Sequence, residues 1–238
     1  MRVDLATPGS ALAIAAHPDD VEFNCGGTLA KWAAQGVTVH HLICTDGSKG
    51  TWDPNEDLDV LVDTRVVEQR SAAAALGASG DVVMLGRTDG ELTSDAGTVE
   101  EIALWIRRLR PEVVFGHDPW KRWRLHPDHR AAGQLVCDGV VAARDPHFFA
   151  HQDEPHHRPD ALLLFETDEP NHYEQIETGA KIAALLEHRS QFVTTMQIDD
   201  PDDISQRDAF AAIISGEARK HGRSIGVRFA EPFRSIAT

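Results

Sequence analysis

Two short segments of the chain contain side chains of the kinds that bind metal ions and transfer protons. Residues 16–20 read Ala-His-Pro-Asp-Asp, and residues 126–129 read His-Pro-Asp-His. Two imidazoles and one carboxylate, with a fourth position left open for water, form a ligand set that hydrolytic zinc enzymes use. His126 and His129 are spaced i, i+3, so in a helix they lie near one face of its first turn. The two segments therefore predict a shared hydrolytic metal site.

The side chains of these segments divide into groups suited to the steps of amide hydrolysis. We expect one zinc ion per chain with three protein ligands: His17, Asp20 and His129. Zinc lowers the pKa of a bound water to about 7 and polarises a carbonyl, so a nucleophile becomes available at neutral pH. Asp19 is expected to act as general base on that water, and His126 as general acid towards the leaving amine. Asp128 is expected to hold His126 in orientation.

Short apolar runs alternate with helix-period segments along the chain. The runs predict strands at residues 11–16, 37–44, 82–85, 113–115, 162–165 and 224–229. Helices are expected at residues 28–34, 62–76, 98–109, 127–143, 177–187 and 205–220. Apolar runs that are continuous rather than alternating indicate strands covered on both faces, as in parallel sheets flanked by helices. Residues 1–238 are therefore predicted to form a single layered α/β domain.

The two motifs follow predicted strands, which is where this class of fold places its ligands. Ligands of open parallel sheets bind outside the carboxyl ends of the strands. Either motif alone has an ordinary explanation, because proline and aspartate are frequent turn residues. Two motifs at one sheet edge favour the shared site over two unrelated turns. The loop of residues 46–59 is long enough to be a lid or binding loop.

Composition and charge narrow the class of partner. The formal net charge of −15 argues against sequence-independent nucleic-acid binding and against docking to anionic lipid. No apolar run approaches the roughly 20 residues of a membrane span, and the first ten residues show no signal peptide. Three widely spaced cysteines suit a reducing compartment better than a disulfide framework. We expect a cytoplasmic protein that binds a small molecule, and neither nucleic acid nor membrane.

The paired motifs resemble those of the zinc-dependent N-deacetylases of the PIG-L/LmbE-like family. The likeness extends to Gly26-Gly27, Arg65 with Glu68, His117-Asp118-Pro119, Lys181 with His188, Ser190 and Gln191, and the segment 230–233. The resemblance implies a Rossmann-like three-layer sandwich with a mostly parallel central sheet and one zinc ion. It also implies hydrolysis of the N-acetyl group of an amino sugar or sugar conjugate, with the site roles given above. Assembly into a homo-oligomer is a further expectation.

Four residues are candidates for contact with the substrate: Arg65, Arg124, Trp52 and Asp118. The Arg65 guanidinium could hydrogen-bond sugar hydroxyls, or it could pair with Glu68 on a helix surface. Some relatives place an oxyanion-binding tyrosine where this chain has Arg124, so Arg124 is a candidate substitute. Trp52 could stack on a sugar ring or anchor its loop by packing. Asp118 could orient a metal-binding histidine or simply stabilise a turn.

Two other functions remain open from the sequence. The same chemistry could cleave another small amide conjugate. Alternatively, the chain could be a non-catalytic protein of the same fold that binds a metal or a carbohydrate. Asp19 separates these hypotheses, because a binding protein needs no carboxylate beside the ligands. Its presence favours an enzyme that hydrolyses a linear amide C–N bond.

Overall fold

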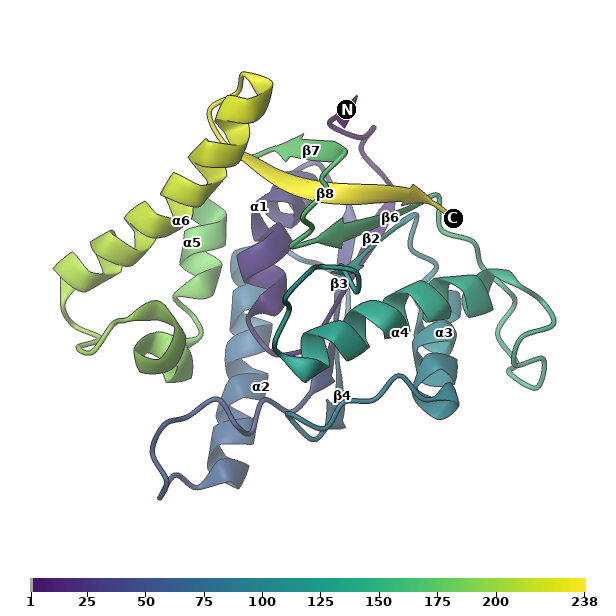
Figure 1. Ribbon diagram of the computed structural model, residues 1–238, viewed down its shortest axis with the longest axis horizontal. Coiled ribbons are helices and arrows are strands. Elements are labelled where there is room, and N and C mark those ends of the chain that lie inside the picture. Colours follow the sequence, from purple (N-terminus) through teal and green to yellow (C-terminus); the bar gives the residue numbers. More distant parts are fainter. Residues whose placement is uncertain (1) are drawn as a thin grey trace.

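The computed structural model describes residues 2–238 and is built around one mixed β-sheet (Figure 1). Its strand order is β1-β7-β8-β6-β5-β2-β3-β4. The strands are β1 (Arg2–Val3), β2 (Ser10–Ala15), β3 (Thr38–Thr45), β4 (Val82–Arg87), β5 (Val113–His117), β6 (Ala161–Phe165), β7 (His172–Gln175) and β8 (Ala230–Ala237). The ladders that join β4, β3, β2, β5 and β6 are parallel, whereas β8 runs antiparallel between β6 and β7.

The order of the parallel strands creates a switch point beside β2. The chain leaves β2 and returns as β3 on one side, and β5 later pairs on the other side. The connections that follow β2 and β5 therefore diverge at the carboxyl edge of the sheet, where open α/β sheets bind their ligands. His17 comes directly after β2, and His117 is the last residue of β5.

Helices cover both faces of the sheet (Figure 1). Their bounds are α1 (Asp20–Ala34), α2 (Leu58–Ala75), α3 (Ala96–Leu109), α4 (Pro127–Arg144), α5 (Gly179–Leu185) and α6 (Ile204–Ile225). Side chains alternate across a strand, so β2 supplies both layers. Leu12 and Ile14 pack with α3 and α4, whereas Ala11 and Ala13 pack with α1 and α2. The helix α6 contacts β8 at the end of the α1 and α5 layer.

The predicted α/β class with a mostly parallel sheet is confirmed, but two predicted elements are wrong. The first helix begins at Asp20 rather than near residue 28, so Gly26 and Gly27 lie inside it. Gly27 has a packing reason to be there, because a Cβ would lie 2.5 Å from Ile176 Cδ1. The last strand is residues 230–237, not 224–229, because α6 continues to Ile225 and ends at Gly226 with φ 79°.

Two short strands were not predicted from the sequence. The strand β7 is polar and four residues long, and β1 has two residues. Neither carries an apolar run that would distinguish it from a loop. Among residues 2–238, no helix has the length and apolar character required to cross a membrane.

We expect the contact between α3 and α4 to dominate the stability of the layer that presents α4. Ile102 is fully buried there, and its side chain packs against Gly139 of α4. Ile102→Ala should lower the free energy of unfolding by about 2–5 kcal/mol through lost burial and the cavity left behind. Ile213→Ala, at a position of α6 that is 56% exposed, is the matched control and should change it by less than about 0.5 kcal/mol. Urea denaturation with an unchanged m value measures both.

Candidate metal and catalytic site

A tight turn between β2 and α1 presents the first motif. The Asp20 carboxylate accepts a hydrogen bond from the His17 backbone N–H at 2.8 Å, which closes the turn on itself. Asp19 lies between them with φ 94° and ψ −29°, in the left-handed region that L residues rarely adopt. All three residues are buried, with 7–8% of their surface exposed. Carboxylates at this position are stabilised by the partial positive charge of the α1 N-terminus.

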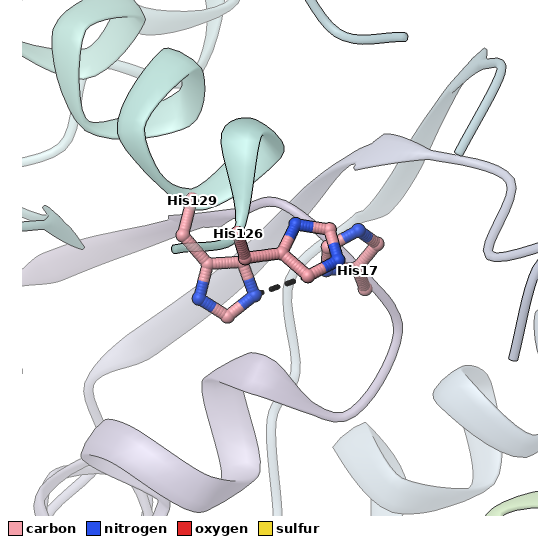
Figure 2. Close-up of side chains that lie close together, drawn as sticks. All are labelled: His17, His126 and His129. Carbon is pink, nitrogen blue, oxygen red and sulfur yellow. Dashed lines mark hydrogen bonds between the residues drawn. The ribbon is translucent and has the colours of Figure 1, made fainter. Parts of the chain in front are cut away.

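The N-terminus of α4 presents the second motif. Pro127 occupies the first helical position, where a missing N–H costs nothing, and His126 is the residue before it. The rings of His126 and His129 lie 4.9 Å apart on the same face of this first turn. The two motifs meet there, as Figure 2 shows for His17, His126 and His129. The prediction that these distant segments lie together is therefore correct.

The spacing of His17, Asp20 and His129 suits a single small cation. His17 Nδ1 lies 3.1 Å from His129 Nε2 and 3.3 Å from Asp20 Oδ2, and His129 Nε2 lies 3.4 Å from Asp20 Oδ1. A tetrahedral ion with ligand distances of about 2.0–2.1 Å separates its ligand atoms by roughly 3.4 Å. Asp20 faces the two histidines through different carboxylate oxygens, and each of the three separations is close to this value. The residues present fit a divalent metal ion.

The cluster offers more donor atoms than one ion needs. Among residues 2–238, three groups place three donor atoms within 4.8 Å of one another: His17 with His126 and His129, Asp20 with His117 and His129, and His17 with Asp89 and Asp128. His126 is exposed, whereas His117 is buried and has other partners. This leaves His126 the imidazole of the cluster that is most open to a substrate.

Carboxylates surround His17 on its other side. His17 Nε2 lies 3.1 Å from Asp128 Oδ2 and 3.2 Å from Asp89 Oδ1. Burial alone would lower the pKa of His17, but hydrogen bonds to Asp128, Asp20 and Asp89 raise it to about 11. The site thus strongly favours positive charge at His17. A bound cation would satisfy the same negative charge in place of the proton.

The expected partnership of Asp128 with His126 is corrected by these contacts. Asp128 is fully buried beneath His17, and its oxygens accept hydrogen bonds from the backbone N–H groups of Gly90 at 2.6 Å and Leu92 at 3.2 Å. Its side chain therefore orients His17. His126 lies at the exposed end of α4, where the Asp128 charge acts on it by a longer-range electrostatic interaction that raises its pKa.

Asp19 has the environment of a basic carboxylate. Burial raises its pKa most, the nearby Arg65 guanidinium opposes this, and the Asp20 carboxylate adds to the rise, which leaves the pKa at about 6. A carboxyl group with this pKa is ionised at pH 7 and is a stronger base than an ordinary aspartate. The distance from Arg65 Nη2 to Asp19 Oδ2 is 3.5 Å.

A second network, which the sequence reading missed, lies behind His129 and Asp20. Glu166, directly after β6, accepts from His117 Nδ1 at 2.8 Å and pairs with Arg124. Arg124 also contacts His129 Nδ1, and His117 Nε2 lies 3.4 Å from Asp20 Oδ2. Burial would raise the pKa of Glu166, but His117, His129 and Arg124 hold it well below its usual value. Glu166 and Asp89 each lie just after a strand, and this position is the sequence feature that could have indicated their place in the site.

The candidate site opens into a cavity of about 720 Å³. His17, Asp19, Asp20, His126, His129 and Arg124 all line it. Its far wall is formed by α6 and the start of β8, through residues such as Ile214, Glu217 and Pro232. A volume of this order holds a small organic ligand.

Of the four residues expected to contact the substrate, Arg124 and Arg65 line the cavity, whereas Trp52 and Asp118 do not. Arg65 lines the cavity but is 3% exposed, and it donates to the carbonyls of Pro18 and Gly47. Arg65 does not pair with Glu68. The Glu68 carboxylate instead accepts hydrogen bonds from the backbone N–H and the hydroxyl group of Ser190. Trp52 is 80% exposed, and the Asp118 carboxylate accepts from the Trp120 N–H at 2.9 Å in a local turn. Neither Trp52 nor Asp118 is among the cavity-lining residues.

Comparison with known proteins identifies the family to which this geometry belongs. The model of the PIG-L family, described as GlcNAc-PI de-N-acetylase, matches residues 12–140. The chain belongs to the PIG-L family. It is 32% identical over 232 residues to the diacetylchitobiose deacetylase of Thermococcus kodakarensis, an alignment that covers 94% of this chain and 82% of that protein.

Two further relatives of this PIG-L protein carry related names. A 1D-myo-inositol 2-acetamido-2-deoxy-alpha-D-glucopyranoside deacetylase of Rhodococcus opacus is 34% identical over 161 residues, or 58% of this chain and 55% of that protein. The solved structure of N,N'-diacetylchitobiose deacetylase from Pyrococcus horikoshii, complexed with its inhibitor MPG, superposes with a TM-score of 0.85. It is 29% identical and covers 97% of this chain and 84% of that one. The predicted family and the prediction of an amide-hydrolysing deacetylase are confirmed.

Removal of His17 provides a direct test of the metal site. His17→Ala should weaken metal affinity by more than the roughly 10- to 100-fold typical of residues that only support the ligands. His151→Ala is the control, because His151 is an exposed histidine paired with Glu100 away from the cluster. Metal content per chain after dialysis, measured by elemental analysis, should fall for the first variant only. Equal metal content in both would refute the ligand assignment.

Proposed function

We propose that this PIG-L protein is a zinc-dependent N-deacetylase that removes acetyl from an N-acetylated amino sugar or sugar conjugate. The observation that carries the proposal is one juxtaposition. The donors of His17, Asp20 and His129, spaced for one ion, share a cavity with a buried carboxylate and an exposed imidazole. The names of the Thermococcus and Rhodococcus relatives support acetylated glucosamine derivatives as the substrate class.

A metal ion in the proposed site would supply Lewis-acid chemistry that the side chains by themselves do not provide. When bound to His17, Asp20 and His129, a zinc ion would polarise the amide carbonyl and lower the pKa of a water molecule. Asp128 and Asp89 hold His17 from behind, and the network of Glu166 and Arg124 holds His129. The carboxylates among these supports fix ring orientation and increase the basicity of the histidine ligands. Burial and the Arg124 cation act in the opposite direction and lower the pKa of His129.

Asp19 is the proposed general base. Its raised pKa of about 6 lets it take a proton from the attacking water while remaining ionised beforehand at neutral pH. The Asp19 carboxylate belongs to the same short turn as His17 and Asp20, so the base stands beside the ligands. This placement has no purpose in a protein that only binds a metal or a carbohydrate.

His126 is the proposed general acid for the departing amine. It lies at the cavity, 4.6 Å from His17 between ring centroids, and it is the exposed imidazole of the cluster. Burial and the neighbouring His17 and His129 lower its pKa, while the carboxylates of Asp128 and Asp89 act in the opposite direction. Negative charge that develops on the carbonyl oxygen would oppose the lowered pKa and favour the protonated ring. In that form His126 stabilises this charge and then protonates the nitrogen.

Arg124 is the proposed substitute for the tyrosine that some relatives use at this point. Its guanidinium lines the cavity and is held by Glu166, close to His129. A fixed cation there would stabilise negative charge on the carbonyl oxygen. Arg65, Trp52 and Asp118 stay predictions as substrate contacts, as do the homo-oligomer, the single-domain organisation and the cytoplasmic location.

A different small amide conjugate is the second candidate substrate. The cavity continues past the site to α6 and β8, so the group attached to the acetylated nitrogen need not be a single sugar ring. An amine-release assay over N-acetylated sugars, disaccharides, inositol conjugates and thiol conjugates distinguishes these classes. Release from none of them by metal-loaded protein would contradict the proposed function.

Asp19→Asn should abolish most turnover without loss of the metal. The substitution keeps the shape of the side chain but removes its basicity, and loss of a general base typically costs about 10²- to 10⁴-fold. Asp208→Asn, an exposed position on α6, is the control and should keep the rate of the unaltered enzyme. Amine release and metal content should be measured on the same preparations. Full activity of Asp19→Asn would show that the base is another group.

Metal removal should stop the reaction reversibly. A chelator is expected to abolish amine release, and about one equivalent of zinc per chain should restore it, since one ion occupies the three-ligand site. Parallel additions of other divalent ions reveal whether zinc is the most effective metal. Activity that persists after the metal content has fallen to zero would refute the metal-dependent mechanism.

A further inference from the structure

The backbone conformation of Asp19 is strained and must be stabilised by contacts with surrounding residues. Its φ of 94° lies in the region that only glycine adopts readily, so such residues persist only where the surrounding structure enforces them. The carbonyl of Asp19 accepts a hydrogen bond from Phe23 in α1 at 3.0 Å, which fixes one side of the residue. The peptide group on its other side joins Pro18 to Asp19 and belongs to no helix or strand.

Two side chains of α2 hold that peptide group from opposite ends. Arg65 Nη2 donates to the Pro18 carbonyl oxygen at 2.7 Å, and Gln69 Oε1 accepts the Asp19 N–H at 3.0 Å. Arg65 and Gln69 are spaced i, i+4, so they project from the same face of α2. Together they fix the plane of the peptide and therefore the direction in which the Asp19 side chain leaves the backbone.

Gln69 is itself held in one orientation. Its Nε2 donates to Glu22 Oε1 at 2.8 Å and lies 3.3 Å from His41 Nδ1. An ionised carboxylate can only accept, so Glu22 prevents the Gln69 amide from exchanging its oxygen and nitrogen. Two imidazoles adjoin the Glu22 carboxylate, with His41 Nδ1 3.5 Å from its Oε1 and His188 Nε2 3.4 Å from its Oε2. All four side chains are buried.

We propose that Gln69 is a positioning residue for the catalytic base. Its amide oxygen holds the Asp19 N–H and keeps the carboxylate aimed at the site, and Glu22 keeps that oxygen turned towards Asp19. The inference rests on the proposed function, in which Asp19 is the base. Gln69 does not line the cavity, and the Asp20 side chain holds the His17 turn independently. Gln69 should therefore affect the rate of the chemical step rather than substrate or metal binding.

The test compares Gln69→Met with a matched change elsewhere. Methionine fills similar space but accepts no strong hydrogen bond, so the Asp19 N–H loses its acceptor. We expect kcat to fall by about tenfold or more, because small displacements of reacting groups have effects of this size. KM and metal content should stay within about twofold of the unaltered enzyme, as expected for an interaction that acts only on the chemical step. Gln134→Met is the matched control, because the Gln134 amide donates to Asp138 on the same helix α4, and it should leave kcat unchanged.

Glu22→Gln provides a second, nearly isosteric variant that stays informative if Gln69→Met does not fold. An amide at position 22 can donate as well as accept, so it no longer excludes the reversed orientation of the Gln69 amide, in which Asp19 N–H has no acceptor. We expect a loss of about threefold or more in kcat, again with KM and metal content retained. A kcat equal to that of the unaltered enzyme would overturn the proposal.

A double-mutant cycle separates positioning from general damage. In the Asp19→Asn background, Gln69→Met should lower the residual rate by less than about twofold, because the group it positions has already lost its function. An equal loss in both backgrounds would show that Gln69 acts through overall stability and would overturn the positioning role. If Asp19→Asn is inactive while both Gln69→Met and Glu22→Gln keep full kcat, only the positioning role fails. An active Asp19→Asn instead contradicts the proposed function itself.

Discussion

The site depends on one electrostatic constraint, which is that two imidazoles and several carboxylates are packed into a small buried volume. The ligand atoms of His17, Asp20 and His129 lie 3.1–3.4 Å apart, and two more carboxylates lie against the far nitrogen of His17. Buried charges of one sign are costly unless they are paired. A positive charge within the cluster, from protons or from a cation, is therefore required. This requirement links the arrangement of the residues to the metal chemistry proposed for them.

The surrounding structure holds each part of the cluster from a different element. Backbone N–H groups after β4 fix Asp128, Glu166 after β6 fixes His117 and Arg124, and α2 fixes the peptide before Asp19. All these supports lie at the carboxyl edge of the parallel sheet, where loops from neighbouring strands converge. The sheet packs against apolar side chains on both faces, so the polar groups at its edge are positioned by packing that they do not themselves provide.

Much of the site could be predicted from the sequence because its information is local. Each motif keeps its donors within one turn of chain. The first directly follows an apolar run that indicates a strand end, and the second begins the helix that comes after the strand β5. Glu166 and Asp89 were missed because a single acidic residue after a strand is common and has no distinguishing spacing. The first helix was predicted too late because Gly26 and Gly27 suggest a turn, whereas tight packing against Ile176 is what places a glycine there.

The sequence by itself determined the chemistry available: the residue types, the two motifs, the strand ends that carry them, and through these the family. Only the tertiary structure decided which groups are partners. Asp128 belongs to His17 rather than His126, Glu68 to Ser190 rather than Arg65, and Gln69 to Asp19. The physical reason is that spacing along the chain fixes the face of a helix on which a side chain projects. The partner it meets is set by how α2, α4 and the strand-end loops pack over the sheet, which involves contacts between residues far apart in the chain.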